Sequence, residues 1–236
     1  MTFLLGILSS LVAGVLFVLA SAFFSQRTRG ILVSLLARLL KLDSEAVFLN
    51  KQDASKDIDK ELLRASDIKI LTGRGNELQR GVLAQFLGGP RPTRLRILRI
   101  VLPLVDFQAS KENPDWLSLR ETELAAFDHV YNSDLLRNQV RANIRYLEAP
   151  VREGRAEVRL FNSPHLGRII VTDAVAYLNR YAATAHGRDC EIVKFRKGGP
   201  MYEYCERAFD LIWSQAIEPY RSTKERRPEA PLQTSS

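Results

Sequence analysis

The sequence predicts an α/β domain, a mixed sheet flanked by helices, preceded by one transmembrane helix. Short apolar runs rich in β-branched residues alternate with segments of helical periodicity, and polar turns separate them, as is typical of α/β domains. Residues 3–24 carry no charged side chain. At about 1.5 Å per residue, that run is long enough to cross a hydrocarbon core of roughly 30 Å. The chain has 236 residues, which leaves room after the span for one globular domain.

Basic residues flank the apolar run only on its C-terminal side, beginning with Arg27 and Arg29. The positive-inside rule therefore predicts a single pass through the inner (plasma) membrane, with the N-terminus outside and the domain in the cytoplasm. A cleaved signal peptide is the alternative, because Ala20-Ser21-Ala22 has the small-x-small form of a cleavage site. The missing basic n-region and the length of the run favour an uncleaved anchor.

Small residues recur every four positions in the predicted span, at Gly6, Ser10 and Gly14. They share one helix face, and small residues at this spacing let two helices approach closely in lipid. The alternative is that small residues are simply common in membrane helices. We expect a homodimer to which this face contributes.

The chain divides into four predicted regions. A juxtamembrane helix over 31–42 follows the anchor, and the polar segment 50–56 is predicted to be the linker to the domain. The last residues are charged and then rich in Pro, Thr and Ser, which is typical of disorder. The predicted regions are the anchor at 1–26, the amphipathic helix and linker at 27–50, the cytosolic domain at 51–220 and the disordered tail at 221–236.

Periodicity predicts the elements of the domain in order. Strands are predicted at 67–71, 94–105, 157–161, 168–172, 175–178 and 191–195. Helices are predicted at 57–65, 77–87, 116–130, 134–147 and 202–217. On the last helix, Phe209 and Trp213 lie four residues apart and share a face, so we predict that both are core residues and not ligand contacts.

Composition limits the partners. The formal charge of +7 indicates anionic neighbours, and anionic lipid accounts for part of it. The two cysteines, Cys190 and Cys205, form no CxxC and no metal-ligand spacing, so we expect no metal and no cofactor. Aromatic residues do not alternate with the basic ones as in a single-strand-binding groove, so nucleic acid is not favoured as a partner.

The segment from Glu157 to Ala216 resembles one catalytic half of the phospholipase D-like superfamily. That half has a strand, a His-x-Lys-x4-Asp motif, a Gly-Ser-x-Asn segment, a strand opening on Glu, and a closing helix with Phe and Trp. This chain supplies EVRLF, then His165, RIIVTD, Ala176-Tyr177-Leu178-Asn179, EIVKF from Glu191, and AFDLIW in the last helix. The resemblance implies a phospholipase D-like fold.

The motif itself departs from the family pattern. Gly167 stands where the family has Lys, and Thr172 stands where it has Asp. A shift of one residue supplies Arg168 and Asp173, so the resemblance implies His165, Arg168 and Asp173 as catalytic candidates. In the family, His attacks phosphorus, Lys binds phosphoryl oxygens and Asp orients an imidazole. A one-residue shift turns a strand side chain to the opposite face, so we predict a degenerate domain that keeps phosphate binding.

Two further groups are candidate ligand-binding residues. The turn Thr72-Gly73-Arg74-Gly75-Asn76 lies between a predicted strand and a helix, where backbone N–H groups can hold an anion; an ordinary glycine turn is the alternative. The second group follows or borders the motif strands, near where the superfamily has its site. The candidates are Thr72, Arg74 and Asn76 in the first group, and Asn179, Arg180, His186 and Glu191 in the second.

Three classes of function remain open. The first is a membrane-anchored sensor or regulatory module that binds an anionic small molecule, a nucleotide or a partner. The resemblance extends this class to bacterial defence effectors, beside which degenerate domains of the superfamily occur. The second is a phosphodiesterase or nuclease that acts as a homodimer, and the third is an oligomerising scaffold. The sequence leaves enzymatic activity undecided and favours the first class.

Overall fold

The computed structural model describes residues 2–24, 35, 43–90, 92–106, 115–132, 134–162 and 167–220. Three predictions fall outside these ranges. They are the juxtamembrane helix, of which only Leu35 is described, the tail at 221–236, and the placement of His165.

The domain is built on one seven-stranded mixed sheet. The strand order is β1-β7-β6-β5-β2-β3-β4, in which β2, β3 and β4 are parallel and the other neighbours are antiparallel. This confirms the predicted α/β class with a mixed sheet. The strands are β1 (Ser44–Phe48), β2 (Asp67–Leu71), β3 (Ile97–Pro103), β4 (Glu157–Phe161), β5 (Gly167–Thr172), β6 (Val175–Arg180) and β7 (Ile192–Arg196).

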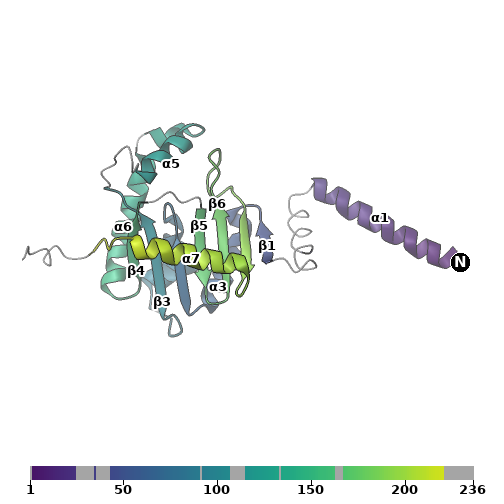
Figure 1. Ribbon diagram of the computed structural model, residues 1–236, viewed down its shortest axis with the longest axis horizontal. Helices are drawn as coiled ribbons and strands as arrows, with labels where there is room; N and C mark the ends of the chain where they lie inside the picture. Colours follow the sequence, from purple (N-terminus) through teal and green to yellow (C-terminus); the bar gives the residue numbers. More distant parts are fainter. Residues whose placement is uncertain are drawn as a thin grey trace, which may run out of the picture.

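Helices cover both faces of the sheet, as Figure 1 shows with α7 lying across the strands. The first face packs against α3 (Lys51–Arg64), α4 (Gly81–Gly88) and part of α6 (Leu135–Arg152). The opposite face packs against α7 (Pro200–Gln215). A smaller third cluster joins α5 (Trp116–Ala125), the 3-10 turn η2 (His129–Asn132) and the start of α6.

The two-residue period of the strands assigns side chains to the two faces. In β5, Ile170 belongs to the core under α3 and α4, whereas Ile169 and Val171 belong to the core under α7. The same alternation occurs in β2, where Ile70 and Leu71 face opposite cores. Burial on both faces explains why these strands are continuous apolar runs in the sequence.

The structure corrects four predicted segments. Residues 51–56 are not a linker, because α3 begins at Lys51 and the side chain of Asn50 accepts a hydrogen bond from the Asp53 N–H as its N-cap. The strand β1 precedes α3 and pairs with β7, so the sheet begins before residue 51. The helix predicted at 77–87 is divided into the 3-10 turn η1 (Asn76–Gln79) and α4, and the helix predicted at 116–130 into α5 and η2.

The N-terminal apolar segment forms the helix α1 (Thr2–Phe24), which lies apart from the sheet in Figure 1. Its side chains are described at 6, 7 and 10–20, and Leu11, Leu16 and Phe17 are among those exposed. In the part of the chain that the structure describes, no helix is long and apolar enough to cross a membrane. The helix is therefore confirmed, and the span remains a prediction.

The predicted aromatic pair on α7 divides into two environments. Phe209 is fully buried, which confirms it as a core residue. Trp213 stacks on Phe209 with ring centroids 5.8 Å apart, but it is only half-buried. The guanidinium groups of Arg99 and Arg159 lie over its ring, at 5.3 and 4.6 Å from the centroid. Trp213 is therefore a packing residue at the border of the core.

Candidate functional site

Several strand ends meet at one edge of the sheet. The parallel strands β2, β3 and β4 all have their carboxyl ends there. Because β5 runs antiparallel to β2, with Leu71 opposite Ile169, β5 begins at that edge. The end of β6 joins it, since Arg180 is opposite Gly167. Loops that follow parallel strands at their carboxyl ends commonly bind ligands in α/β folds, so this edge of the sheet is a candidate ligand site.

A cavity of about 260 Å³ lies at this carboxyl edge. We call it the edge cavity. Its walls come from the loop after β2, the start of β5, the end of β6, and the α5–η2 segment. Its polar and aromatic lining consists of Lys51, Thr72, Arg74, Asn76, Glu77, Arg80, Trp116, Arg120, Asp128, Tyr131, Arg168, Asn179, Tyr181, His186 and Arg188.

The edge cavity carries an excess of positive charge. Six of its lining side chains are Lys or Arg, and two, Glu77 and Asp128, are carboxylates. Two of the six have carboxylate partners outside the lining, since Arg120 lies 2.6 Å from Glu123 and Arg188 lies 3.5 Å from Asp189, which leaves Lys51, Arg74, Arg80 and Arg168 as the main source of the excess. Asp128 is paired with His186, whose Nε2 lies 3.1 Å from its carboxylate. Charges that face a cleft with low-dielectric walls focus their field into it. The cavity is therefore electrostatically suited to an anion.

Arg168 is the most buried cation of the cavity, with 6% of its surface exposed. Its guanidinium lies 3.7 Å from Glu77 Oε1, and the ammonium of Lys51 lies 3.7 Å from Glu77 Oε2. Oε1 is buried and has no hydrogen-bond partner among the described residues. One carboxylate is thus shared at long range between two cations, so the group as a whole remains positive.

Burial and charge have opposite effects on these pKa values. Burial alone would raise the pKa of Glu77, but Arg168 and Lys51 outweigh it and hold that pKa below its usual range. The pKa of Lys51 is lowered, because burial and the nearby Arg168 together exceed the attraction of Glu77. Burial is the main cause of the lowered lysine pKa, and the neighbouring Arg168 and Arg80 add to it.

The loop after β2 is held rigidly at the cavity. Gly75 has φ of 86°, and a Cβ placed on it would lie 2.8 Å from Leu102, so glycine is required there. Its N–H donates to Thr72 Oγ1 at 3.3 Å. Asn143 of α6 donates to the carbonyl of Arg74 at 2.7 Å and to Asn76 Oδ1 at 3.0 Å. The loop leads into a short 3-10 turn, so the predicted α-helix N-terminus is not what faces an anion here.

Aromatic rings position two of the arginines. The Arg74 guanidinium lies 5.2 Å from the ring centroid of Tyr131, and that of Arg120 lies 5.4 Å from that of Tyr181. Arg120 also donates to the carbonyls of Ala182 and Ala185, at 3.0 and 3.1 Å. Burial raises the pKa of the Tyr181 hydroxyl, which accepts a hydrogen bond from the Gly73 N–H. These contacts fix the side chains before any ligand arrives.

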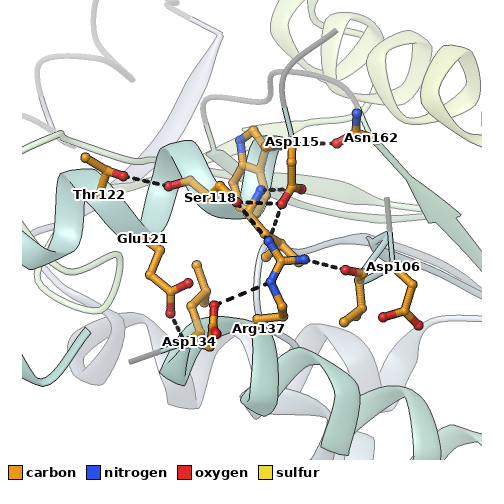
Figure 2. Close-up of polar contacts among 12 residues, drawn as sticks. Asp106, Asp115, Ser118, Glu121, Thr122, Asp134, Arg137 and Asn162 are labelled. Carbon is orange, nitrogen blue, oxygen red and sulfur yellow. Dashed lines mark hydrogen bonds and ion pairs between the residues drawn. The ribbon is translucent and has the colours of Figure 1, made fainter. Parts of the chain in front are cut away.

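Arg137 of α6 attaches the α5 segment to the sheet above the cavity. Its guanidinium donates to the carbonyl of Val105, to the carboxylate of Asp115, and to Ser118 Oγ at 2.9 Å, as Figure 2 shows. Burial raises the pKa of Asp115, but the hydrogen bonds from Arg137 and Ser118 lower it more, so the carboxyl is held in its charged form. The Trp116 N–H donates to Asn162 after β4 at 3.1 Å. The α5–η2 wall is therefore part of the rigid domain.

The structure brings together six of the predicted site residues. They line the edge cavity and come from four separate segments of the chain. They are Thr72, Arg74, Asn76, Arg168, Asn179 and His186. Asn179 lies opposite Arg168 in the sheet and uses its amide N–H groups to bind the carbonyls of Cys190 and Glu191, so it contributes to the wall mainly by fixing the adjacent loop.

Other predicted residues do not join this group. Asp173 follows the opposite end of β5, five residues from Arg168 or roughly 16 Å at about 3.3 Å per residue. Its carboxylate accepts hydrogen bonds from the N–H and hydroxyl of Ser66. Arg180 and Glu191 form an ion pair with each other outside the cavity lining. His165 lies outside the described residues, so the shifted triad is not assembled among those described.

Six charged lining residues were not predicted from the sequence, namely Lys51, Glu77, Arg80, Arg120, Asp128 and Arg188. They lie in segments that were interpreted as a linker, as helices or as plain surface. The one available signal was the excess of Lys and Arg over Asp and Glu, which gives no positions. Among the described residues, no group of three or more His, Cys, Asp or Glu is placed to hold a metal ion.

No family model matches the chain, and no curated protein matches it in sequence. Solved structures similar in shape include the following two. TrmBL2, an archaeal chromatin protein with a novel mode of DNA binding, is 14% identical, with a TM-score of 0.43, over 89% of this chain and 67% of that one. Nuc from Salmonella typhimurium, a phospholipase D family member, is 13% identical, with a TM-score of 0.43, over 75% of this chain and 98% of that one. Similarity at this level supports no argument about activity.

Proposed function

We propose that the domain is a ligand-binding sensor or regulatory module, and that the edge cavity binds a phosphate-bearing anion. The observation that carries this proposal is the cluster of six Lys and Arg side chains around a cavity with only two carboxylates. Phosphate offers three oxygens to such a cluster, and arginine forks match them with paired hydrogen bonds.

Partial burial strengthens this interaction. Arg168 is almost fully buried, and Arg74 and Arg120 are positioned by aromatic rings. Charge pairs of this kind are stronger in a low-dielectric site than in water, and less side-chain freedom is lost when the donors are already placed. The shared carboxylate of Glu77 offsets the mutual repulsion of Lys51 and Arg168.

Catalysis by a phospholipase D mechanism is the weaker alternative. It needs a cation and a carboxylate beside the histidine. Arg168 and Asp173 keep the spacing of the family's Lys and Asp, but both are shifted by one residue relative to His165, which turns each to the opposite face of an extended chain. The Asp173 carboxylate also accepts hydrogen bonds from the N–H and hydroxyl of Ser66, and Asp173 does not line the edge cavity. We therefore propose binding, within a phospholipase D-like fold, and not phosphodiester cleavage.

The proposal includes a membrane location. α1 is a 23-residue helix whose sequence has no charged residue, and its described apolar side chains are exposed. Insertion in the inner membrane would cover them and would leave the domain in the cytoplasm. The small residues of α1, Gly6, Ser10 and Gly14, would then bring two copies together as a homodimer. A reporter enzyme fused after Ser236 should be active only in its cytoplasmic form.

Calorimetry with inorganic phosphate and pyrophosphate tests the binding proposal directly. The full chain in detergent should bind both, and Arg168→Gln should weaken binding by about 10- to 100-fold, the effect of a lost charge-assisted hydrogen bond of roughly 1.5–3 kcal/mol. Arg180→Gln is the matched control, since Arg180 lies outside the cavity lining. No anion binding by the wild type, or equal loss in both variants, would overturn the proposal.

A further inference from the structure

A second, larger cavity adjoins the edge cavity. It has a volume of about 990 Å³ and opens beside the start of α3 and α4. We call it the side cavity. The two cavities share five lining residues, Lys51, Glu77, Arg80, Arg168 and Arg188. These five shared residues, four of which are cations, form the junction between the two cavities. A molecule held at the junction can extend into either cavity.

The side cavity differs from the edge cavity in chemistry. Its floor is apolar and is made by Ile58 and Leu62 of α3, Leu83 of α4 and Ile170 of β5, all buried. Its rim includes the polar side chains of Gln52, Ser55 and Asp59. Pockets for small organic ligands are commonly about 300–1,000 Å³ in volume and combine an apolar lining with a few polar groups. An inorganic anion would leave this apolar floor uncovered.

We infer that the ligand is a phosphate ester, with its phosphate at the cationic junction and its organic group in the side cavity. This inference rests on the proposed function and adds the ligand class to it. The organic group is compact and partly polar, as a nucleoside is, because Gln52, Ser55 and Asp59 offer hydrogen bonds at the rim. A long acyl chain would leave these polar groups without partners, so lipid phosphates are an outcome that the test must separate.

Affinities for inorganic phosphate, adenosine 5′-monophosphate, phenyl phosphate, hexyl phosphate and adenosine test the inference on the full chain in detergent. At least one of the two esters with a ring-containing organic group, adenosine 5′-monophosphate or phenyl phosphate, should bind about tenfold or more tightly than inorganic phosphate, because its organic group covers the apolar floor. Adenosine should bind more weakly than its phosphate ester. A preference for hexyl phosphate over both adenosine 5′-monophosphate and phenyl phosphate would overturn the assignment of a compact, partly polar group.

A cavity-filling variant locates the organic group. Ser55 is exposed on α3 and lines the side cavity only, so Ser55→Trp should fill that cavity without touching the edge cavity. It should reduce ester affinity to that of inorganic phosphate and leave phosphate binding within about twofold. Lys56→Trp, at the adjacent exposed position outside both cavity linings, should change neither affinity.

The outcomes separate the two proposals. If inorganic phosphate binds and no ester binds more tightly, the inference fails and the proposed function stands. Equal ester affinity in Ser55→Trp and the wild type would also overturn the inference. If neither phosphate nor any ester binds, both proposals fail.

Discussion

Two buried cations on the same face of the sheet have different surroundings. Lys194 of β7 contacts two carboxylates of α3, Asp57 at 3.0 Å and Glu61 at 3.1 Å. Arg168 of β5 is paired, among the described residues, with Glu77 alone and at the longer distance of 3.7 Å. The carboxylates around Lys194 exceed its charge, whereas Arg168 shares its carboxylate with a second cation. The first arrangement stabilises the fold, and the second leaves positive charge for a ligand.

Hydrogen bonding follows the same division. Around Lys194, the hydroxyl of Tyr177 donates to Asp57 at 2.6 Å, so that carboxylate has two partners. Burial lowers the pKa of Lys194, but Asp57 and Glu61 raise it more, so the ammonium is held charged. At the junction, Glu77 Oε1 has no hydrogen-bond partner in the described chain. A satisfied network is typical of structure, and an incomplete one is typical of a site.

The largest expected effect is on stability at the Lys194 cluster. Lys194→Met leaves the partly buried carboxylates of Asp57 and Glu61 without their cation. Breaking a fully buried pair costs about 3–5 kcal/mol of unfolding free energy, so we expect a loss at the lower end of that range. Urea denaturation followed by circular dichroism measures this loss. Lys197→Met, at an exposed position just after β7, should cost little. Equal losses of unfolding free energy in the two variants would contradict a structural role for the Lys194 cluster.

Added phosphate should stabilise the domain through the junction and not through the Lys194 cluster. At a phosphate concentration of about 100 times Kd, binding adds roughly 2.7 kcal/mol to the unfolding free energy of the wild type. In Arg168→Gln, with a Kd 10- to 100-fold higher, the gain at the same phosphate concentration should fall to about 0.4–1.4 kcal/mol, and it should persist in full in Lys197→Met. Thermal melts with phosphate and with chloride at equal ionic strength make the comparison, and a gain that chloride reproduces would count against specific binding.

A smaller change is expected at the shared carboxylate. Glu77→Gln removes the negative charge that competes with the ligand for Arg168 and Lys51, so phosphate affinity should rise several-fold, or about 1 kcal/mol. In phosphate-free buffer the variant should be less stable than the wild type, because the two cations lose their counter-charge. Calorimetry and denaturation of the same preparation measure both, and a fall in affinity would show that Glu77 acts mainly by orienting Arg168.

The smallest effect is in the pH dependence of stability. The folded-state pKa of Glu77 lies below its ordinary value of 4.5. Its contribution to stability is therefore complete above the unfolded pKa and is lost as the pH falls through the lower folded pKa. In acid, the difference in unfolding free energy between the wild type and Glu77→Gln should shrink. A difference that stays constant from pH 7 to about pH 3 would contradict the assigned pKa direction.

Sequence patterns predicted the elements of the domain well where packing and pattern agree. The strands at 67–71 and 157–161 match β2 and β4 residue for residue, because their apolar runs are buried on both faces of the sheet. The other predicted strands and helices also occur in the predicted order, but the strand β1 was not predicted. Errors concentrate at the ends of elements, where a single contact decides at which residue a helix or strand begins. Asn50 begins α3 six residues earlier than the periodicity indicated, and the positive φ of Gly75 leads into a separate 3-10 turn.

The candidate site was predicted in part. Thr72, Arg74 and Asn76 were recognised from a glycine-rich turn after a strand, and Arg168 from a shifted motif, and all four line the edge cavity. The motif also suggested Asp173, which the alternation and length of β5 place elsewhere. Local pattern identifies a residue type and a strand end, but it does not show which other segments arrive at the same edge.

The sequence alone determined the α/β class, the N-terminal apolar helix and the excess of positive charge, because these depend on composition and local periodicity. Tertiary structure decided which charges matter. Lys51 and Arg168 are more than a hundred residues apart in the chain, yet they meet at Glu77, while Lys194 is neutralised by α3. The energy of a charge depends on its burial and on its neighbours in space, and neither quantity is local in sequence.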